Sequence, residues 1–174
     1  LFAAGNVLHT TTGNQAISGV PNRYNTGAAS IGNFCFLECT GTLGSTAHNA
    51  TITYTDTTPN AAEAGPAAAV TVSSTATRMP LPYWYYALNA GDRGCQTVTN
   101  VALSAVSSGT SAIVQGHPLI WFPCPTAGVM VPYDGINSMF NLTQILDNAC
   151  LAFLELKNQA SASIYTGNII LVSG

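Results

Sequence analysis

Charged side chains are scarce in this sequence. Asp, Glu, Lys and Arg make up 6% of its 174 residues, whereas a soluble domain usually contains about 25%. A free monomer normally stays soluble through a charged surface of mixed sign. We therefore expect a surface that is either neutral and rich in hydroxyl groups, as in an ordinary extracellular β-protein, or covered by the neighbours of a large assembly.

The shortage of basic residues and of long apolar runs excludes two classes of partner. Three arginines and the single Lys157, in a chain of net charge −3, cannot form the basic stripe that nucleic-acid binding requires. No apolar run reaches the roughly 18 residues of a transmembrane helix. The first residues, Leu1–Ala4, lack the charged start of a signal peptide, although a chain that begins with Leu can have lost residues before it.

The five cysteines are an odd number, which argues against a fully paired secreted framework. Several have the surroundings of buried thiols: Cys35 lies between two phenylalanines, and Cys150 lies in an apolar stretch. We therefore expect a chain made in a reducing cytoplasm, with one disulfide left open as an alternative.

Short alternating segments dominate the sequence and predict an all-β fold. In 51–55, Ile52 and Tyr54 face one way and three threonines face the other, as in a half-buried strand. Similar segments recur at spacings of about ten residues, separated by Gly, Pro and Asn, which is typical of an antiparallel β-sandwich or a jelly-roll-like fold. At most one short helix is expected, over 136–148, where apolar residues recur every three or four positions.

The predicted organisation is one sandwich domain with an arm. Residues 1–30 are rich in Gly, Asn, Thr and Ala without periodicity, so they predict an extended arm or loops with little strand. Residues 31–174 form the single β-sandwich domain. The final strand, 169–172, is apolar on both faces, which predicts a central strand or one that pairs with another chain.

The middle of the chain is its most informative part. An aromatic run bracketed by prolines, 80–86, leads into a tight turn at 89–94 and then an alternating strand over 95–106. Residues 107–110, Ser-Ser-Gly-Thr, predict a hairpin turn into a return strand. The aromatics are more typical of a core or an interface than of a sugar-stacking surface, since interfaces are enriched in aromatics and depleted in charge.

No catalytic or cofactor motif stands out. Cys35, Cys39 and His48 suggest zinc but lack the second ligand pair of a structural site, and no G-x-S-x-G elbow supports a Ser-His-Asp triad. His117 is expected to be a hydrogen-bonding residue at a strand end. The acidic residues are expected mainly in turns, with no loop rich enough in oxygens for calcium. The acidic residues are Glu38, Asp56, Glu63, Asp92, Asp134, Asp147 and Glu155. We therefore expect no enzyme activity, cofactor or metal.

Several segments together resemble a type of tailed-bacteriophage virion protein. They are 52–55, 68–81, 90–94 with the strand after it, and 142–156, which includes the run Asp-Asn-Ala-Cys-Leu at 147–151. The pattern is similar to small β-rich head decoration or cement proteins, which sit on the outer capsid lattice and join neighbouring capsomers. The resemblance covers roughly residues 50–156 and rests on strand and turn pattern.

This resemblance implies a non-enzymatic protein of the virion, made in the host cytoplasm. Its partners would be the major capsid protein and copies of itself, for example in a trimer, with neither nucleic acid nor membrane involved. Neck or tail locations, a carbohydrate-binding or adhesin β-sandwich, and a hydrolase with an unrecognised site are the alternatives. The expected interface residues are Leu1, Phe2, Pro80, Pro82, Tyr83, Trp84, Tyr85, Tyr86, Ile169, Ile170, Leu171 and Val172.

Overall fold

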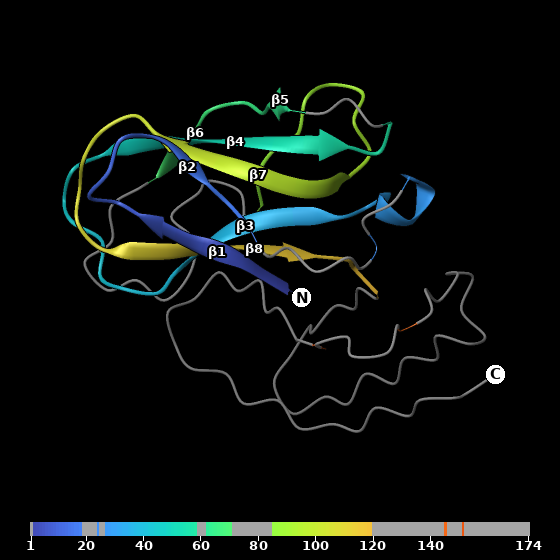
Figure 1. Cartoon of the computed structure of the whole chain (residues 1–174), viewed down its shortest axis with the longest axis horizontal. Helices are drawn as coiled ribbons and strands as arrows, with labels where there is room; N and C mark the ends of the chain where they lie inside the picture. Colours follow the sequence, from blue (N-terminus) through green and yellow to red (C-terminus); the bar gives the residue numbers. More distant parts are fainter. Residues whose placement is uncertain are drawn as a thin grey trace, which may run out of the picture.

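The computed structural model describes residues 2–18, 24, 27–58, 62–70, 85–119, 145 and 151, with side chains from Asn6 onward. These residues form an all-β sandwich of two antiparallel sheets (Figure 1), which confirms the expected fold class. One 3-10 turn, η1 (Gly27–Ser30), is the helical element in this part of the chain. The helix predicted over 136–148 and the strand predicted over 169–172 lie outside the described residues, apart from Ile145.

No helix in the described ranges has the length and apolar character needed to cross a membrane.

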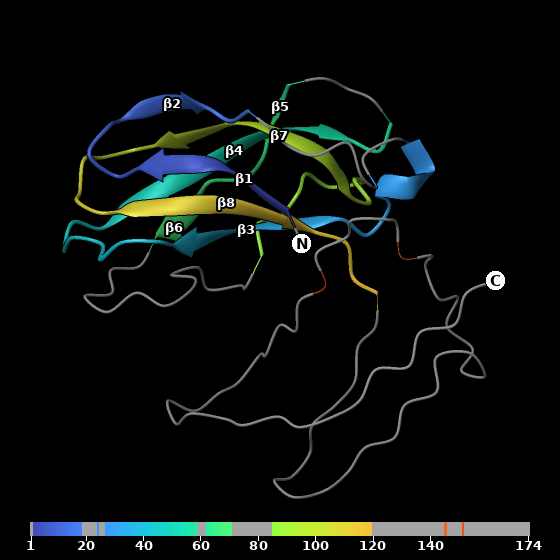
Figure 2. The same ribbon diagram turned by 60° about the horizontal axis from the view of Figure 1, so that its bottom comes forward.

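The first sheet has three strands in the order β1-β8-β3. The middle strand, β8 (Thr110–Gly116), pairs with β1 (Phe2–Leu8) on one side and with β3 (Phe34–Cys39) on the other, as Figure 2 shows. The pairing of β1 shifts register between Ala4 and Asn6, which marks a β-bulge. Residues 111–116 of β8 are all buried, so both faces of this strand are covered.

The second sheet has five strands, with β2-β7-β4-β5 as its main path. Its long strands are β4 (His48–Asp56) and β7 (Cys95–Leu103). The short strand β2 (Gly13–Ala16) pairs with β7. Strands β5 (Glu63–Ala64) and β6 (Ala68–Val70) both pair with β4, β5 toward its end and β6 at its start.

The N-terminal segment was predicted to be an arm with little strand, and for residues 2–16 this prediction was wrong. Strands β1 and β2 come from this segment and each joins a different sheet. The side chains of Val7 and His9 are 0% exposed, and Ile17 is 8% exposed. The Gly- and Thr-rich composition does not indicate these strands, because their stability comes from pairing and burial rather than from local propensity.

The prediction of a hairpin at 107–110 was also wrong. β7 and β8 belong to different sheets, so the connection between them crosses from one layer to the other. Its hydrogen bonds go to other loops: the Ser107 amide donates to the His9 carbonyl (2.7 Å), and the Gly44 amide donates to the Ser108 carbonyl (3.0 Å). The residue types permitted a turn but did not specify which strands it joins.

The core lies between the two sheets. β4 alternates as predicted, with Ile52 and Tyr54 0% exposed and the threonines between them half-buried. β7 departs from strict alternation, because its pairing with β4 shifts register twice and places Val98, rather than Thr99, inward. Each shift puts an extra residue on β7, as in a β-bulge.

Candidate functional site

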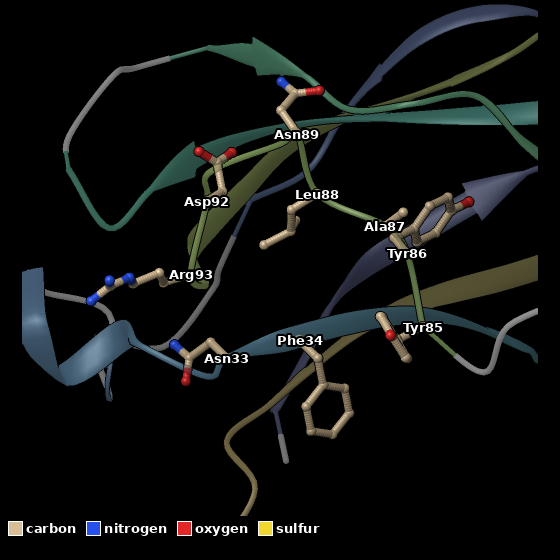
Figure 3. A pocket seen from close by; sticks show the side chains of 9 residues that line it. All are labelled: Asn33, Phe34, Tyr85, Tyr86, Ala87, Leu88, Asn89, Asp92 and Arg93. Atoms are coloured by element: carbon tan, nitrogen blue, oxygen red, sulfur yellow. The ribbon is translucent and has the colours of Figure 1, made fainter.

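A hollow of about 370 Å³ opens where the start of β3 meets the segment 85–93 (Figure 3). Tyr85 lies toward one side of it, and Asp92 and Arg93 lie toward the other. The full lining is Asn33, Phe34, Tyr85, Tyr86, Ala87, Leu88, Asn89, Asp92 and Arg93.

Two neighbouring tyrosines at this hollow have opposite environments. Tyr86 is 1% exposed and packs in the core, and its backbone amide donates to the Cys35 carbonyl (2.8 Å), which fixes the segment beside β3. Burial raises the pKa of the Tyr86 phenol. Tyr85, in contrast, is 41% exposed. Of these two predicted interface residues, Tyr85 is therefore the one that is partly accessible at the surface.

The turn at 89–94 forms as predicted and carries a polar network. The Asp92 amide donates to the Asn89 carbonyl (3.1 Å), and Gly91 has φ +104°, a conformation that glycine adopts without strain. The Tyr54 hydroxyl donates to Asp92 Oδ2 and accepts from the Asn89 amide (2.9 Å). Burial, followed by the Asp92 carboxylate, raises the pKa of Tyr54, so this phenol stays a donor.

Three carboxylates converge beside this network. One oxygen from each of Asp56, Glu63 and Asp92 lies within 4.8 Å of the others. Asp56 ends β4, Glu63 begins β5 and Asp92 lies in the turn, so the β4-β5 pairing and the 89–94 turn bring them together. Such oxygens can hold a hard cation such as Ca²⁺, or two of the carboxylates can share a proton.

The electrostatics of this acidic cluster favour the protonated form of Glu63. Desolvation, and then the charge and hydrogen bond of Asp92, raise the pKa of Glu63, and the charge of Asp56 adds to the effect. Glu63 Oε2 is shielded from solvent and has no hydrogen-bond partner among the described residues. Sequence reasoning assigned these acids mainly to turns. It did not predict that they converge, because their convergence depends on strand register.

A second constellation, which the sequence did not predict, lies in the interior. His9 Nδ1 is 2.8 Å from His48 Nε2, and His9 Nε2 is 2.7 Å from Ser111 Oγ. His48 Nδ1 lies 2.8 Å from the Thr46 carbonyl. A carbonyl only accepts, so His48 carries its proton on Nδ1; His9 Nδ1 then donates to His48, and Ser111 donates to His9.

The contact between Ser111 and His9 resembles a catalytic serine with its histidine base, but it is not accessible to substrates. Ser111 and His9 are 0% exposed and His48 is 6% exposed. Burial, and then the charge of His48, lower the pKa of His9 to about 4, so the ring is neutral at pH 7. The network therefore joins the ends of β1, β4 and β8 rather than facing a cleft.

His117 has the role that the sequence predicted. It follows β8, and its Nδ1 lies 2.7 Å from Asn33 Oδ1. Its ring stacks on Tyr24 with centroids 4.6 Å apart. Asn33 Nδ2 in turn donates to the Tyr24 carbonyl (2.6 Å) and to the Cys95 carbonyl (3.1 Å), so these residues fasten the start of β3 to the start of β7.

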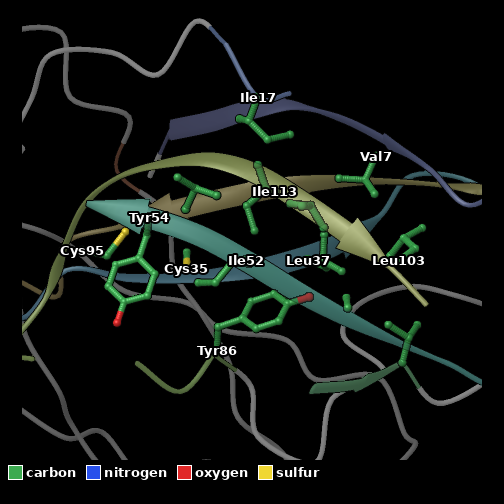
Figure 4. Close-up of a cluster of buried hydrophobic side chains, with 14 of the residues drawn as sticks. Val7, Ile17, Cys35, Leu37, Ile52, Tyr54, Tyr86, Cys95, Leu103 and Ile113 are labelled. Carbon is green, nitrogen blue, oxygen red and sulfur yellow. The ribbon is translucent and has the colours of Figure 1, made fainter. Parts of the chain in front are cut away.

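The cysteines in the described ranges are buried thiols, as expected for Cys35. All three, Cys35, Cys39 and Cys95, are unpaired and belong to the core cluster. Figure 4 shows Cys35 and Cys95 within it. Cys39 Sγ lies 3.9 Å from Ser111 Oγ, which is a weak polar contact. Within the described chain, the group of ligand atoms with metal-site spacing is the acidic cluster rather than Cys35, Cys39 and His48.

Most of the predicted interface residues lie outside the described residues. Phe2 begins β1, but its side chain is not described. The residues that fall outside are Leu1, Pro80, Pro82, Tyr83, Trp84, Ile169, Ile170, Leu171 and Val172.

Comparison with protein-family models, curated proteins and solved structures finds no match to this chain.

Proposed function

We propose that this chain is a non-enzymatic structural protein of a virion, a decoration or cement protein that binds the outer capsid surface and joins neighbouring capsomers. Its partners in this proposal are the major capsid protein and further copies of the chain. The proposal starts from the resemblance in strand and turn pattern, and two structural observations support it.

The observation that carries the proposal is an uncharged outer face on the second sheet. The outward residues of β4 and β7 are partly exposed and bear hydroxyl or amide groups, with Thr53 opposite Asn100 and Thr55 opposite Thr97. A neighbour that docks on such a face needs to desolvate no charge, so hydrogen bonds and shape complementarity can supply the contact. Its central polar residues are Thr51, Thr53, Thr55, Thr97, Thr99 and Asn100.

A non-enzymatic role is also supported by the location of the serine–histidine contact. Ser111 is 0% exposed, so the one serine described with a histidine partner offers no nucleophile to a substrate. A decoration protein requires a rigid core and complementary surfaces, and buried polar networks that lock strand ends serve that requirement.

The location of β1 and β2 changes how the proposal can be tested. Deleting residues 1–30 would remove two paired strands and the buried Val7 and His9, so loss of binding by that truncation would only report unfolding. A substitution on the neutral outer face avoids this problem. Thr53→Glu places a charge at the centre of the face while leaving its inward neighbours Ile52 and Tyr54 intact.

The test is reconstitution of purified chain onto particles from its source, followed by sedimentation and electron microscopy. Wild-type chain and Ser45→Glu, which adds the same charge at an exposed loop position, should bind in many copies. Thr53→Glu should remain folded and lose most binding. Equal binding by both variants would remove this face from the proposal, and a wild-type chain that stays free beside such particles would reject the virion role.

A carbohydrate-binding sandwich is the second candidate, favoured by the hollow in Figure 3. An exposed Tyr85 lies there with the polar Asn89, Asp92 and Arg93, a combination of aromatic ring and hydrogen-bonding groups that suits a sugar. Saturable binding on a glycan array, lost in Tyr85→Ala and retained in Leu8→Ala, would favour this function. Leu8 is the control because it is also exposed, at 47%.

A further inference from the structure

Two buried thiols face the same interior from opposite layers of the sandwich. Cys35 lies in β3 of the first sheet, and Cys95 begins β7 of the second sheet. Both are 0% exposed and belong to the same core cluster. Figure 4 shows their two side chains in the core between the layers.

Main-chain and amide contacts hold these two strand segments together. The Gly32 amide donates to the Arg93 carbonyl (2.7 Å), which joins the approach to β3 with the approach to β7. Gln115 is the cross-strand partner of Cys35, and its Nε2 donates to the Cys95 carbonyl (2.7 Å). Cys35 and Cys95 are thus connected through one buried side chain, which fixes their relative position.

The thiols also contact each other. A hydrogen bond with Cys95, together with burial, raises the pKa of the Cys35 thiol well above its usual range. In the closed fold the Cys35 thiol therefore stays protonated and unreactive, since the thiolate is the nucleophile. Reaction requires a local opening that admits solvent and a reagent.

We propose that Cys35 and Cys95 form a disulfide that joins the two sheets when the chain meets a small-molecule disulfide as oxidant. One thiol loses its proton during an opening, and its sulfur attacks the reagent, which releases one small thiolate. The second cysteine, deprotonated in turn, attacks the mixed disulfide and releases the other. Overall, two cysteine thiols become one disulfide, and the reagent is reduced to two small thiols.

Cys39 provides an internal comparison for this pair. It lies on the same strand as Cys35 and belongs to the same core cluster, but its sulfur contacts the Ser111 hydroxyl rather than a cysteine. A reaction controlled only by burial or strand would treat Cys35 and Cys39 alike. A reaction controlled by the contact across the sandwich selects Cys35.

The bond would change how the sandwich unfolds. It would close a covalent loop from residue 35 to residue 95 and so reduce the conformational freedom of the unfolded state. For a loop of this length, the expected rise in the melting temperature is on the order of 10 °C. The reaction concerns the chain itself and does not depend on the virion proposal.

The test is oxidation of the full chain by glutathione disulfide, with the chain taken through a mild reversible unfolding step so that both thiols become accessible. Remaining thiols are alkylated, and the digested peptides are mapped by mass spectrometry. The expected product is a peptide pair joined through Cys35 and Cys95, with Cys39 alkylated. Joining of either residue to Cys124 or Cys150, glutathione retained on Cys35, or full alkylation of both would overturn the proposal.

Melting temperatures provide an independent readout. Wild-type chain and the matched control Cys39→Ala should both melt higher after oxidation, whereas Cys35→Ala and Cys95→Ala should not. If Cys35→Ala fails to fold, Cys95→Ala and the peptide map of the wild-type chain still decide the question. Stabilisation that persists in Cys95→Ala would also overturn the proposal.

Discussion

The ring of His9 contacts the ring of His48 through a hydrogen bond of 2.8 Å between Nδ1 and Nε2. His9 also contacts Ser111, whose hydroxyl lies near Cys39 Sγ. These polar neighbours, within the described part of the chain, include no carboxylate, so a proton added to His9 would create a buried charge that they cannot neutralise. The network is therefore stable only while the His9 ring is neutral.

This contact predicts loss of stability in mild acid. The pKa of His9 is about 4 in the folded chain and 6.5 in the unfolded chain, so between these values the unfolded state takes up a proton that the folded state does not. The free energy of unfolding should fall by up to about 3 kcal/mol as the pH drops from 6.5 to 4. Urea unfolding at a series of pH values measures this change.

A pair of variants assigns that pH dependence to His9. His9→Gln should be less stable at pH 7 but lose less further stability in acid. His117→Asn should retain the His9 contribution, although burial also lowers the pKa of His117 and makes it a smaller contributor of the same sign. An unchanged pH slope in His9→Gln would contradict the prediction.

Glu63→Gln should stabilise the chain at neutral pH. The raised pKa of Glu63 means that the folded state favours its protonated form, so the stability it contributes is present below the unfolded pKa and is lost as the pH rises through the folded pKa. The neutral amide removes the repulsion from Asp92 and Asp56. Thermal melts should show a higher melting temperature at pH 7 and little difference near pH 4, whereas Glu38→Gln should not reproduce this pattern.

Two glycines with positive φ should respond differently to alanine. A Cβ at Gly109 would lie 2.2 Å from the Thr42 carbonyl oxygen, whereas a Cβ at Gly91 would meet nothing within 4 Å. Gly91→Ala should cost about 1 to 2 kcal/mol through backbone strain alone. Gly109→Ala adds the steric conflict and should cost roughly 3 to 5 kcal/mol. Equal unfolding free energies for the two variants would contradict the close approach of Gly109 to Thr42.

The bulge in β7 predicts that substitutions at two adjacent residues, Val98 and Thr99, differ in their cost to stability. Val98 is 1% exposed, so Val98→Thr should bury a hydroxyl and cost about 1 to 3 kcal/mol. Thr99 faces outward and donates to the Thr53 carbonyl (3.2 Å), so Thr99→Val should cost about 1 kcal/mol or less. Chemical denaturation of both variants measures this difference, and the reverse order would place Thr99 in the core.

Alternation along the sequence was sufficient where a strand is regular. Ile52 and Tyr54 were expected on one face of their strand, and both are buried. The same reasoning counted inward from Val101 and Leu103 would place Thr99 inside. It fails there because alternation within one strand carries no information about an extra residue relative to its partner.

The candidate sites were less predictable because they join segments that are distant in the sequence. The acidic cluster needs Asp56, Glu63 and Asp92 to meet through strand pairing and a turn, and the interior network needs His9 and His48 to meet at the ends of two strands. Residue type suggested what each side chain can do. The topology, including the crossing between β7 and β8, decided which side chains meet.

The bulge between Ala4 and Asn6 has a consequence for chains held close together. In the described first sheet β1 lies at an edge, where a straight strand would offer a continuous template for a strand of another molecule. Fibril-forming segments need about six regular residues, and the bulge leaves only short regular stretches on either side. A chain with so little charge repulsion can thereby be crowded at high density without growing into fibrils through this edge.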